Sequence, residues 1–186
     1  MRRRFRLFPL LFVLASCEGA WTDLDAAHLG PEQRAQRERA IAARNELSAD
    51  LIAALGEAVL SGGPARAISV CSESARSIAE SVSRRSGLRI GRTSNRLRNR
   101  DNAPPAWAKD AIARSPQAEV LRAGPRGELC ALFPIRIQAP CLACHGPRQG
   151  IDGAVRSALA RLYPDDRATG YALNDLRGWF WVEVPR

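Results

Sequence analysis

Five consecutive residues in the C-terminal third of this 186-residue chain combine two thiols with an imidazole: Cys141, Leu142, Ala143, Cys144 and His145. In a C-x-x-C-H sequence the two thiols can form thioether bonds to the two vinyl groups of one haem, and the adjacent imidazole can bind the iron. One turn of chain places the two thiols along the porphyrin edge and the imidazole beneath the ring. The segment therefore predicts one covalent haem c, attached through Cys141 and Cys144, with His145 as an axial ligand.

Two other chemistries use the same residue types at this spacing. A thioredoxin-like disulfide normally follows a strand and opens a helix, whereas Pro140 precedes this pair and Gly146-Pro147 follows it. Zinc usually takes four Cys or His ligands, and the other candidates are Cys71, Cys130 and His28. We favour haem, with a redox-active or structural disulfide as the second interpretation and zinc as the third.

The second axial position on the iron can be approached by elimination. The only methionine is Met1, which a cleaved leader would remove, and the other histidine, His28, lies near the N-terminus. Lys109 would have to lose its proton before it could bind iron. Cys71, Cys130, water or an empty position remain, and the residues alone leave these alternatives open.

The first seventeen residues have the three parts of a secretory signal. Residues 1–6 are basic, residues 7–14 are apolar, and small residues precede Cys17. The apolar run is much shorter than the roughly 20 residues of a membrane-spanning helix, so we expect a lipoprotein signal peptide at 1–16, with Cys17 acylated. The alternative is an ordinary cleaved signal with an incidental cysteine. Glu18 follows where inner-membrane lipoproteins usually have aspartate, which predicts a lipid-anchored protein on the periplasmic side of the cell envelope, at the outer membrane.

The net charge of the chain is relevant to whether it binds nucleic acid. The formal net charge is +9, and four of the arginines lie in the leader, which leaves +5 for the remainder. No basic run with interleaved aromatic residues occurs outside the leader, and export would separate the chain from nucleic acid. We therefore expect no nucleic-acid partner and a membrane contact through the N-terminal lipid.

The rest of the chain predicts one domain. Residues 17–30 have no periodic apolar pattern and are expected to form a flexible tether. The haem domain is predicted at 31–186, with a helical part at 31–85 and a sheet part at 86–186. Helices followed by a meandering antiparallel sheet with inserted helices give the fold class α+β.

Apolar side chains at steps of three and four predict two helices in the first part. The first runs from Pro31 to about Gly62 with at most one break, and its apolar residues include Leu47, Leu51, Leu55 and Val59. The second runs from Pro64 to about Arg85 and has Cys71 on its apolar stripe.

The second part predicts strands and short helices. Strands are expected at 88–93, 118–122, 128–137 and 176–184, and helices at 105–114 and 152–162. The turn at 124–127 joins two strands into a hairpin. On its second strand the apolar residues Leu129, Ala131, Phe133, Ile135 and Ile137 alternate along one face, so Cys130 is expected on the opposite face.

Taken together, the segments resemble single-haem c-type proteins of PAS-like fold, a family first catalogued as a domain of unknown function with a cyanobacterial prototype. The resemblance covers most of residues 40–186. It is carried by Ala67-Ile68-Ser69-Val70-Cys71 with Ala75 and Ile78-Ala79, Arg92-Thr93-Ser94, Arg98-Asn99, Asn102-Ala103-Pro104 with Trp107, Cys141-Leu142-Ala143-Cys144-His145-Gly146, Tyr163-Pro164-Asp165 with Ala168, Gly170-Tyr171, and Asp175-Leu176-Arg177-Gly178.

The resemblance implies a site as well as a fold. In that family the histidine of the attachment motif and a helical cysteine hold the iron, and the matching residues here are His145 and Cys71. Arg92 and Arg98 become candidate partners of the haem propionates, because forked charged donors suit carboxylates. The chain departs from the family pattern at Arg100, where proline is usual, and at Ala108, where glutamate is common.

A thiolate ligand favours ferric iron and therefore a low reduction potential. The sequence thus predicts a low-potential electron-transfer cytochrome with a redox partner protein. The alternative is a redox or gas sensor in which reduction releases the cysteine and a small gas replaces it. No transducer domain is expected before Arg186, which favours the carrier, and a peroxidase-like enzyme is the weakest interpretation.

Overall fold

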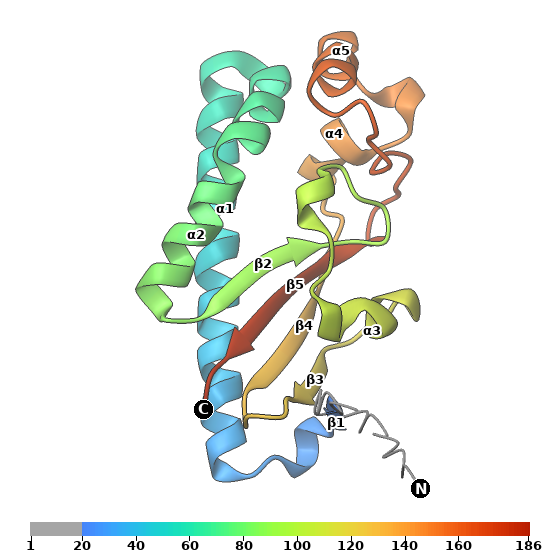
Figure 1. Cartoon of the computed structure of the whole chain (residues 1–186). Helices are drawn as coiled ribbons and strands as arrows, with labels where there is room; N and C mark the ends of the chain where they lie inside the picture. Colours follow the sequence, from blue (N-terminus) through green and yellow to red (C-terminus); the bar gives the residue numbers. More distant parts are fainter. Residues whose placement is uncertain (1–19) are drawn as a thin grey trace, which may run out of the picture.

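The computed structural model describes residues 20–186 (Figure 1). The predicted signal peptide at 1–16 and the predicted lipidation site at Cys17 lie outside the described residues. The α-helices are α1 (Pro31–Glu73), α2 (Ala75–Ser86), α3 (Lys109–Ala113), α4 (Leu142–His145) and α5 (Gly153–Leu162). The strands are β1 (Thr22–Leu24), β2 (Arg89–Thr93), β3 (Val120–Ala123), β4 (Leu129–Arg136) and β5 (Leu176–Val184).

The helical part is broken where glycine follows glycine. α1 begins at Pro31, which suits the first helical position because its missing N–H would have no partner there. Inside α1, Gly62 and Gly63 have non-helical backbone angles, and the φ of Gly63 is 73°, a left-handed value that favours glycine. A separate helical segment, 64–73, follows this break and carries Cys71. The predicted second helix is itself divided at Ser74, where α1 gives way to α2.

The five strands form one antiparallel sheet in the order β1-β3-β4-β5-β2. The predicted hairpin is present as β3 and β4, joined through a turn in which Gly127 has a φ of 81°. β5, the last strand in the sequence, lies in the sheet between β4 and β2. The predicted α+β class, with long N-terminal helices and a PAS-like antiparallel sheet, is confirmed.

The sheet separates two apolar layers. α1 and α2 cover one face, where Ala131 and Val182 pack against Leu47 on α1. The short α3 and the 3-10 turn before it cover the other face (Figure 1). Cys130 and Leu132 point to that second face, as the alternation along β4 predicts. The site residues therefore lie on a scaffold whose two faces are both closed by apolar packing.

The predicted tether at 17–30 is wrong for part of its length. Residues 22–24 form β1, the edge strand, which pairs with β3, and Leu29 is buried in the core. Asp23 on β1 binds Arg122 on β3 at 2.7 Å. An edge strand is stabilised by its partner strand rather than by its own apolar pattern, so a three-residue strand leaves almost no periodic signal in the sequence.

Candidate functional site

The C-x-x-C-H segment forms a single helical turn. Cys141 precedes α4, and Cys144 and His145 are its last residues. Both thiols are half-buried and free. A side chain at Gly146 would place its Cβ 2.6 Å from the Leu142 carbonyl oxygen, so only glycine fits directly after the histidine. The turn therefore presents two thiols and an imidazole within five residues, close to the end of β4.

The imidazole of His145 is held by the loop between α5 and β5. Its Nδ1 lies 2.6 Å from the Ala168 carbonyl oxygen, which can only accept, so Nδ1 carries the proton. Nε2 is then the unprotonated nitrogen, the atom that can bind a metal. Burial, together with the charges of Arg98 and Arg177, lowers the pKa of His145 to about 2. The ring is therefore neutral, as a metal ligand must be.

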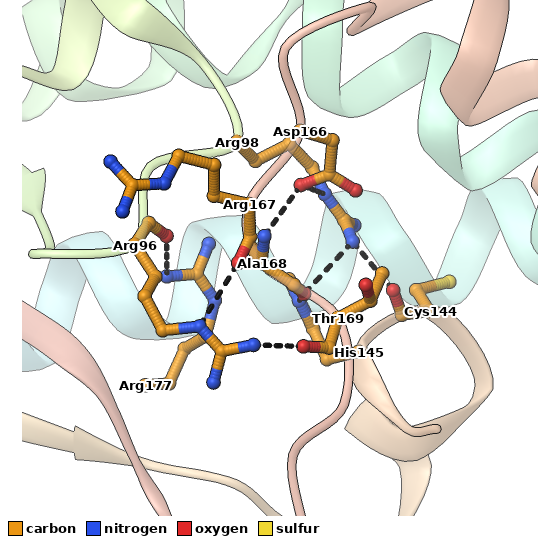
Figure 2. Close-up of polar contacts among 9 residues, drawn as sticks. All are labelled: Arg96, Arg98, Cys144, His145, Asp166, Arg167, Ala168, Thr169 and Arg177. Atoms are coloured by element: carbon orange, nitrogen blue, oxygen red, sulfur yellow. Dashed lines mark hydrogen bonds and ion pairs between the residues drawn. The ribbon is translucent and has the colours of Figure 1, made fainter. Parts of the chain in front are cut away.

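Arg98 joins the turn to this loop (Figure 2). Its Nη2 donates to the Cys144 carbonyl at 2.5 Å and to the Ala168 carbonyl at 3.2 Å. Its Nε donates to Asp166 Oδ1 at 3.2 Å, and both side chains of this ion pair are 9% exposed. The structure thus places Arg98, a predicted propionate partner, in contact with the backbone around His145.

Cys71 faces the same end of the molecule from the segment 64–73. Ile68, one turn earlier, packs against Val155 on α5 and against Tyr163. Burial raises the pKa of the Cys71 thiol, while the charges of Arg92 and Arg98 lower it. A charge on Cys71 also raises the pKa of Cys144. Cys71 therefore lies within electrostatic range of Cys144, Arg92 and Arg98.

Arginine and tyrosine side chains surround this end of the molecule. Arg96 and Arg177 lie over the ring of Tyr171, at 4.2 and 5.7 Å from its centroid, and that ring meets His145 edge-on at 6.3 Å. Burial lowers the pKa of Arg92 and lowers that of Arg177 to about 10. The cluster is therefore electropositive and partly desolvated.

Several buried polar atoms in this region have no hydrogen-bond partner among residues 20–186. They are Thr93 Oγ1, Tyr171 OH and Arg177 Nε. Buried polar atoms are normally paired, so such atoms point to a missing polar group. Sequence reasoning did not single out Arg96, Tyr171 or Arg177, although two of them fall in the segments of family resemblance. Their role depends on contacts with residues distant in the sequence.

The other candidate axial ligands lie elsewhere. Cys130 is fully buried against Trp107 and Trp179 on the far face of the sheet, and burial raises the pKa of its thiol. His28 binds Asp25 at 2.7 Å, just ahead of the start of α1. Of the two cysteines left open by the sequence, the structure brings only Cys71 toward the C-x-x-C-H turn. Within the described part of the chain, no three His, Cys, Asp or Glu side chains meet to hold a metal ion by themselves.

Fold and site together define an α+β protein in which a neutral imidazole, three cysteines and an arginine cluster gather at one end of an antiparallel sheet. The chain belongs to the Tll0287-like family, whose sequence profile matches residues 27–185. This confirms the family resemblance that the sequence motifs indicated.

The fold also matches a solved structure, the crystal structure of the cyanobacterial haem protein Tll0287. The TM-score is 0.61 and the sequence identity is 23%, and the match covers 85% of this chain and 98% of that chain. No curated protein matches the chain.

Proposed function

We propose that this protein binds one haem c covalently through Cys141 and Cys144, with His145 as an axial ligand. The observation that carries the proposal is the hydrogen bond from His145 Nδ1 to the Ala168 carbonyl. Ligating histidines usually donate their second ring N–H in this way, which fixes the tautomer and the ring orientation. Membership of a family whose namesake is a haem protein supports the same assignment.

The surroundings of the turn fit a group with two carboxylates. Arg92 and Arg177 are half-buried cations whose pKa values are lowered by desolvation, and Tyr171 OH is a buried donor without a partner in the described residues. Haem propionates would supply the missing acceptors and balance the charge. We therefore assign the propionate contacts to Arg92, as the sequence suggests, and add Arg177 and Tyr171. Arg98 stays a candidate only through its remaining donors.

We assign the second axial position to Cys71. Burial raises the pKa of its thiol, and the nearby charges of Arg92 and Arg98 oppose that rise. When bound, the haem supplies one-electron redox chemistry, and a thiolate ligand shifts it toward the ferric state. The protein's own part is to hold two ligands from distant segments and to exclude water with apolar residues such as Ile68 and Leu159. A low-potential electron carrier is the function that this arrangement supports best.

One observation favours a redox or gas sensor as a second candidate. The segment 64–73, which carries Cys71, is bounded by the Gly62-Gly63 break and by Ser74. Such a segment can shift with little change in the rest of α1, which is what release of Cys71 on reduction would need. Mixing the reduced protein with carbon monoxide separates the two functions. Rapid binding supports a sensor, and absence of binding supports a carrier.

The location of the protein is proposed from its first residues. We propose export, cleavage after residue 16, acylation of Cys17 and attachment to the outer membrane from the periplasmic side. In Figure 1 the first described strand, β1, lies at the end of the molecule away from α4 and α5. An anchor at Cys17 would then leave the haem end directed away from the lipid. Globomycin-sensitive processing and radiolabelled palmitate on the wild type but not on Cys17→Ala would test this.

The haem proposal is tested by expression in a host with c-type cytochrome maturation. The wild-type protein should keep its pigment after acid-acetone extraction, and Cys141→Ser/Cys144→Ser should lose it. Cys130→Ser is the matched control, because that cysteine lies outside the site, and it should keep the pigment. A colourless wild-type protein contradicts the proposal. Cys71→Ala should move the ferric optical spectrum toward high spin, and an unchanged spectrum removes Cys71 from the iron.

A further inference from the structure

Both backbone polar groups of Ala168, its carbonyl and its N–H, are hydrogen-bonded to side chains. Its carbonyl accepts hydrogen bonds from His145 Nδ1 at 2.6 Å and from Arg98 Nη2 at 3.2 Å. Its N–H donates to Asp166 Oδ1 at 2.8 Å. Ala168 is itself fully buried. The carbonyl that orients the imidazole is therefore shared with a guanidinium group and cannot move independently of it.

Arg98 connects the Ala168 carbonyl to the attachment turn. Besides Ala168, it donates to the carbonyl of Cys144, the residue directly before the histidine, and to Asp166 (Figure 2). One planar guanidinium thus fixes both the chain that carries the imidazole and the carbonyl that accepts the hydrogen bond from that imidazole. In a desolvated setting such charge-assisted bonds are stronger than at the surface.

We propose that Arg98 is a positioning residue that sets the orientation and the donor strength of His145. The inference rests on the proposed function, because it concerns His145 as an iron ligand. A carbonyl that accepts only from a ligating histidine raises the basicity of that ligand. A second, cationic donor on the same carbonyl reduces this effect, and its positive charge disfavours ferric iron. Arg98 therefore raises the reduction potential above the value that the two axial ligands alone would give.

This role differs from the one that the sequence suggests for Arg98. A propionate partner would change the potential through its charge alone and would leave the bond between iron and histidine as it is. A positioning residue changes both. The frequency of the iron–histidine stretching band in the resonance Raman spectrum reports that bond directly. A Cys71→Ala background is the proper one for the measurement, because His145 is then the only protein axial ligand.

The experiment compares three variants in full-length protein matured with haem. Arg98→Leu removes the charge and the fork, Arg98→Lys keeps the charge without the planar fork, and Arg100→Leu is the matched control. Arg100 carries the same charge two residues away, but it is exposed and pairs with the Asp165 carboxylate rather than with the carbonyls of Cys144 and Ala168. We expect Arg98→Leu to lower the reduction potential and to raise the iron–histidine frequency. Arg98→Lys should restore the potential in part but leave the frequency raised, and Arg100→Leu should change neither.

Several results would overturn the inference. If Arg98→Leu lowers the reduction potential but leaves the iron–histidine band unchanged, Arg98 acts only through its charge or as a propionate partner. Full restoration of both readouts by Arg98→Lys would lead to the same conclusion. If Arg98→Leu does not fold, Asp166→Asn loosens the same guanidinium and should raise the iron–histidine frequency by less, and an unchanged frequency contradicts the role.

Failure of the proposed function has a different signature. Wild-type protein without acid-acetone-resistant pigment contradicts the haem assignment and, with it, the role of Arg98. A pigmented wild type whose Arg98 variants are unaltered contradicts the role of Arg98 alone.

Discussion

Arg122 and Arg177 show how differently the two ends of this molecule are built. Arg122, on β3, is 7% exposed, and it donates to Asp23, to Asp110 and to the Trp107 carbonyl. Arg177, on β5, has a buried Nε without a partner among residues 20–186, and burial lowers its pKa to about 10. The first arginine is neutralised by the chain itself. The second is surrounded by other arginines, with Asp166 as the nearby acid.

The difference indicates which half of the protein is complete without a ligand. Burying a charge is costly unless that charge is paired and hydrogen-bonded. Around Arg122 the chain meets that condition internally, whereas near α4 Arg92 and Arg177 meet it only if an anionic group is added. We therefore expect the sheet half to fold with or without haem, and the other end to depend on it. The following predictions test this contrast, from the largest expected effect to the smallest.

Two leucines provide the strongest test. Leu132 is fully buried on the sheet, and Leu159 on α5 packs in the cluster that contains Cys144. Leu132→Ala should cost about 3–5 kcal/mol of unfolding free energy, equally in the holo protein and in Cys141→Ser/Cys144→Ser. In the haem-free protein, Leu159→Ala should cost less unfolding free energy than Leu132→Ala. Once haem is attached, the cost of Leu159→Ala should increase. Urea unfolding measures all four values. Equal costs for Leu159→Ala in both forms would remove the contrast.

Arg122→Leu should destabilise the sheet half by about 2–3 kcal/mol, because hydrogen bonds from a charged donor are lost and the Trp107 carbonyl keeps no charged partner. Haem should not alter this cost. Arg89→Leu is the control, since the Arg89 side chain is 73% exposed in its pair with Glu183, and it should change stability by less than about 1 kcal/mol. Thermal and urea unfolding of both variants provide the comparison. A haem-dependent cost for Arg122→Leu would contradict the account.

Arg177→Leu should behave in the opposite way. In the haem-free protein it removes a half-buried cation whose buried Nε has no partner in the described residues, so the unfolding free energy should stay within about 1 kcal/mol or increase. In the holo protein the same change should decrease it, because a propionate loses its partner. The sign of the effect with and without haem, measured by urea unfolding, decides the matter. A decrease of equal size in both forms would show that the chain itself satisfies Arg177.

The smallest effect concerns pH. The hydrogen bond from Arg122 holds the pKa of Asp110 well below its usual value. A carboxyl with a lowered pKa contributes stability above its unfolded pKa of about 4 and loses that contribution as the pH falls. Because Asp110 is 55% exposed, solvent limits the contribution to about 1 kcal/mol. Asp110→Asn should therefore flatten the acid limb of the stability profile between about pH 4 and pH 2. An unchanged profile would contradict this.

Local patterns in the sequence predicted much of the fold, whereas contacts between segments distant in the sequence could not be predicted. The hairpin of β3 and β4, the break in the helices near Gly62 and the position of Cys130 on the far face follow from periodicity and turn residues. β1 could not be predicted, because its hydrogen bonds come from β3, about a hundred residues later. The same holds for the role of Arg98, whose acceptors at Cys144 and Ala168 lie 46 and 70 residues further along the chain.

The sequence could predict only those parts of the candidate site whose residues are adjacent in the chain. Cys141, Cys144 and His145 form one short motif, so their shared turn could be expected from the sequence. The placement of Cys71 near Cys144 came from family resemblance, since an apolar helical stripe does not reveal what it faces. Tyr171 and Arg177 had no sequence signal of their own, because an unpaired buried atom can be recognised only when its neighbours are known.

The central claim is that one haem joins the thiols of Cys141 and Cys144. Mass spectrometry of a proteolytic digest of the matured protein tests it most directly. The account predicts a single peptide that contains both cysteines, carries the added mass of one haem and is not alkylated by iodoacetamide at either thiol. A peptide without haem whose two thiols are alkylated, or which carries an internal disulfide instead, would contradict the account.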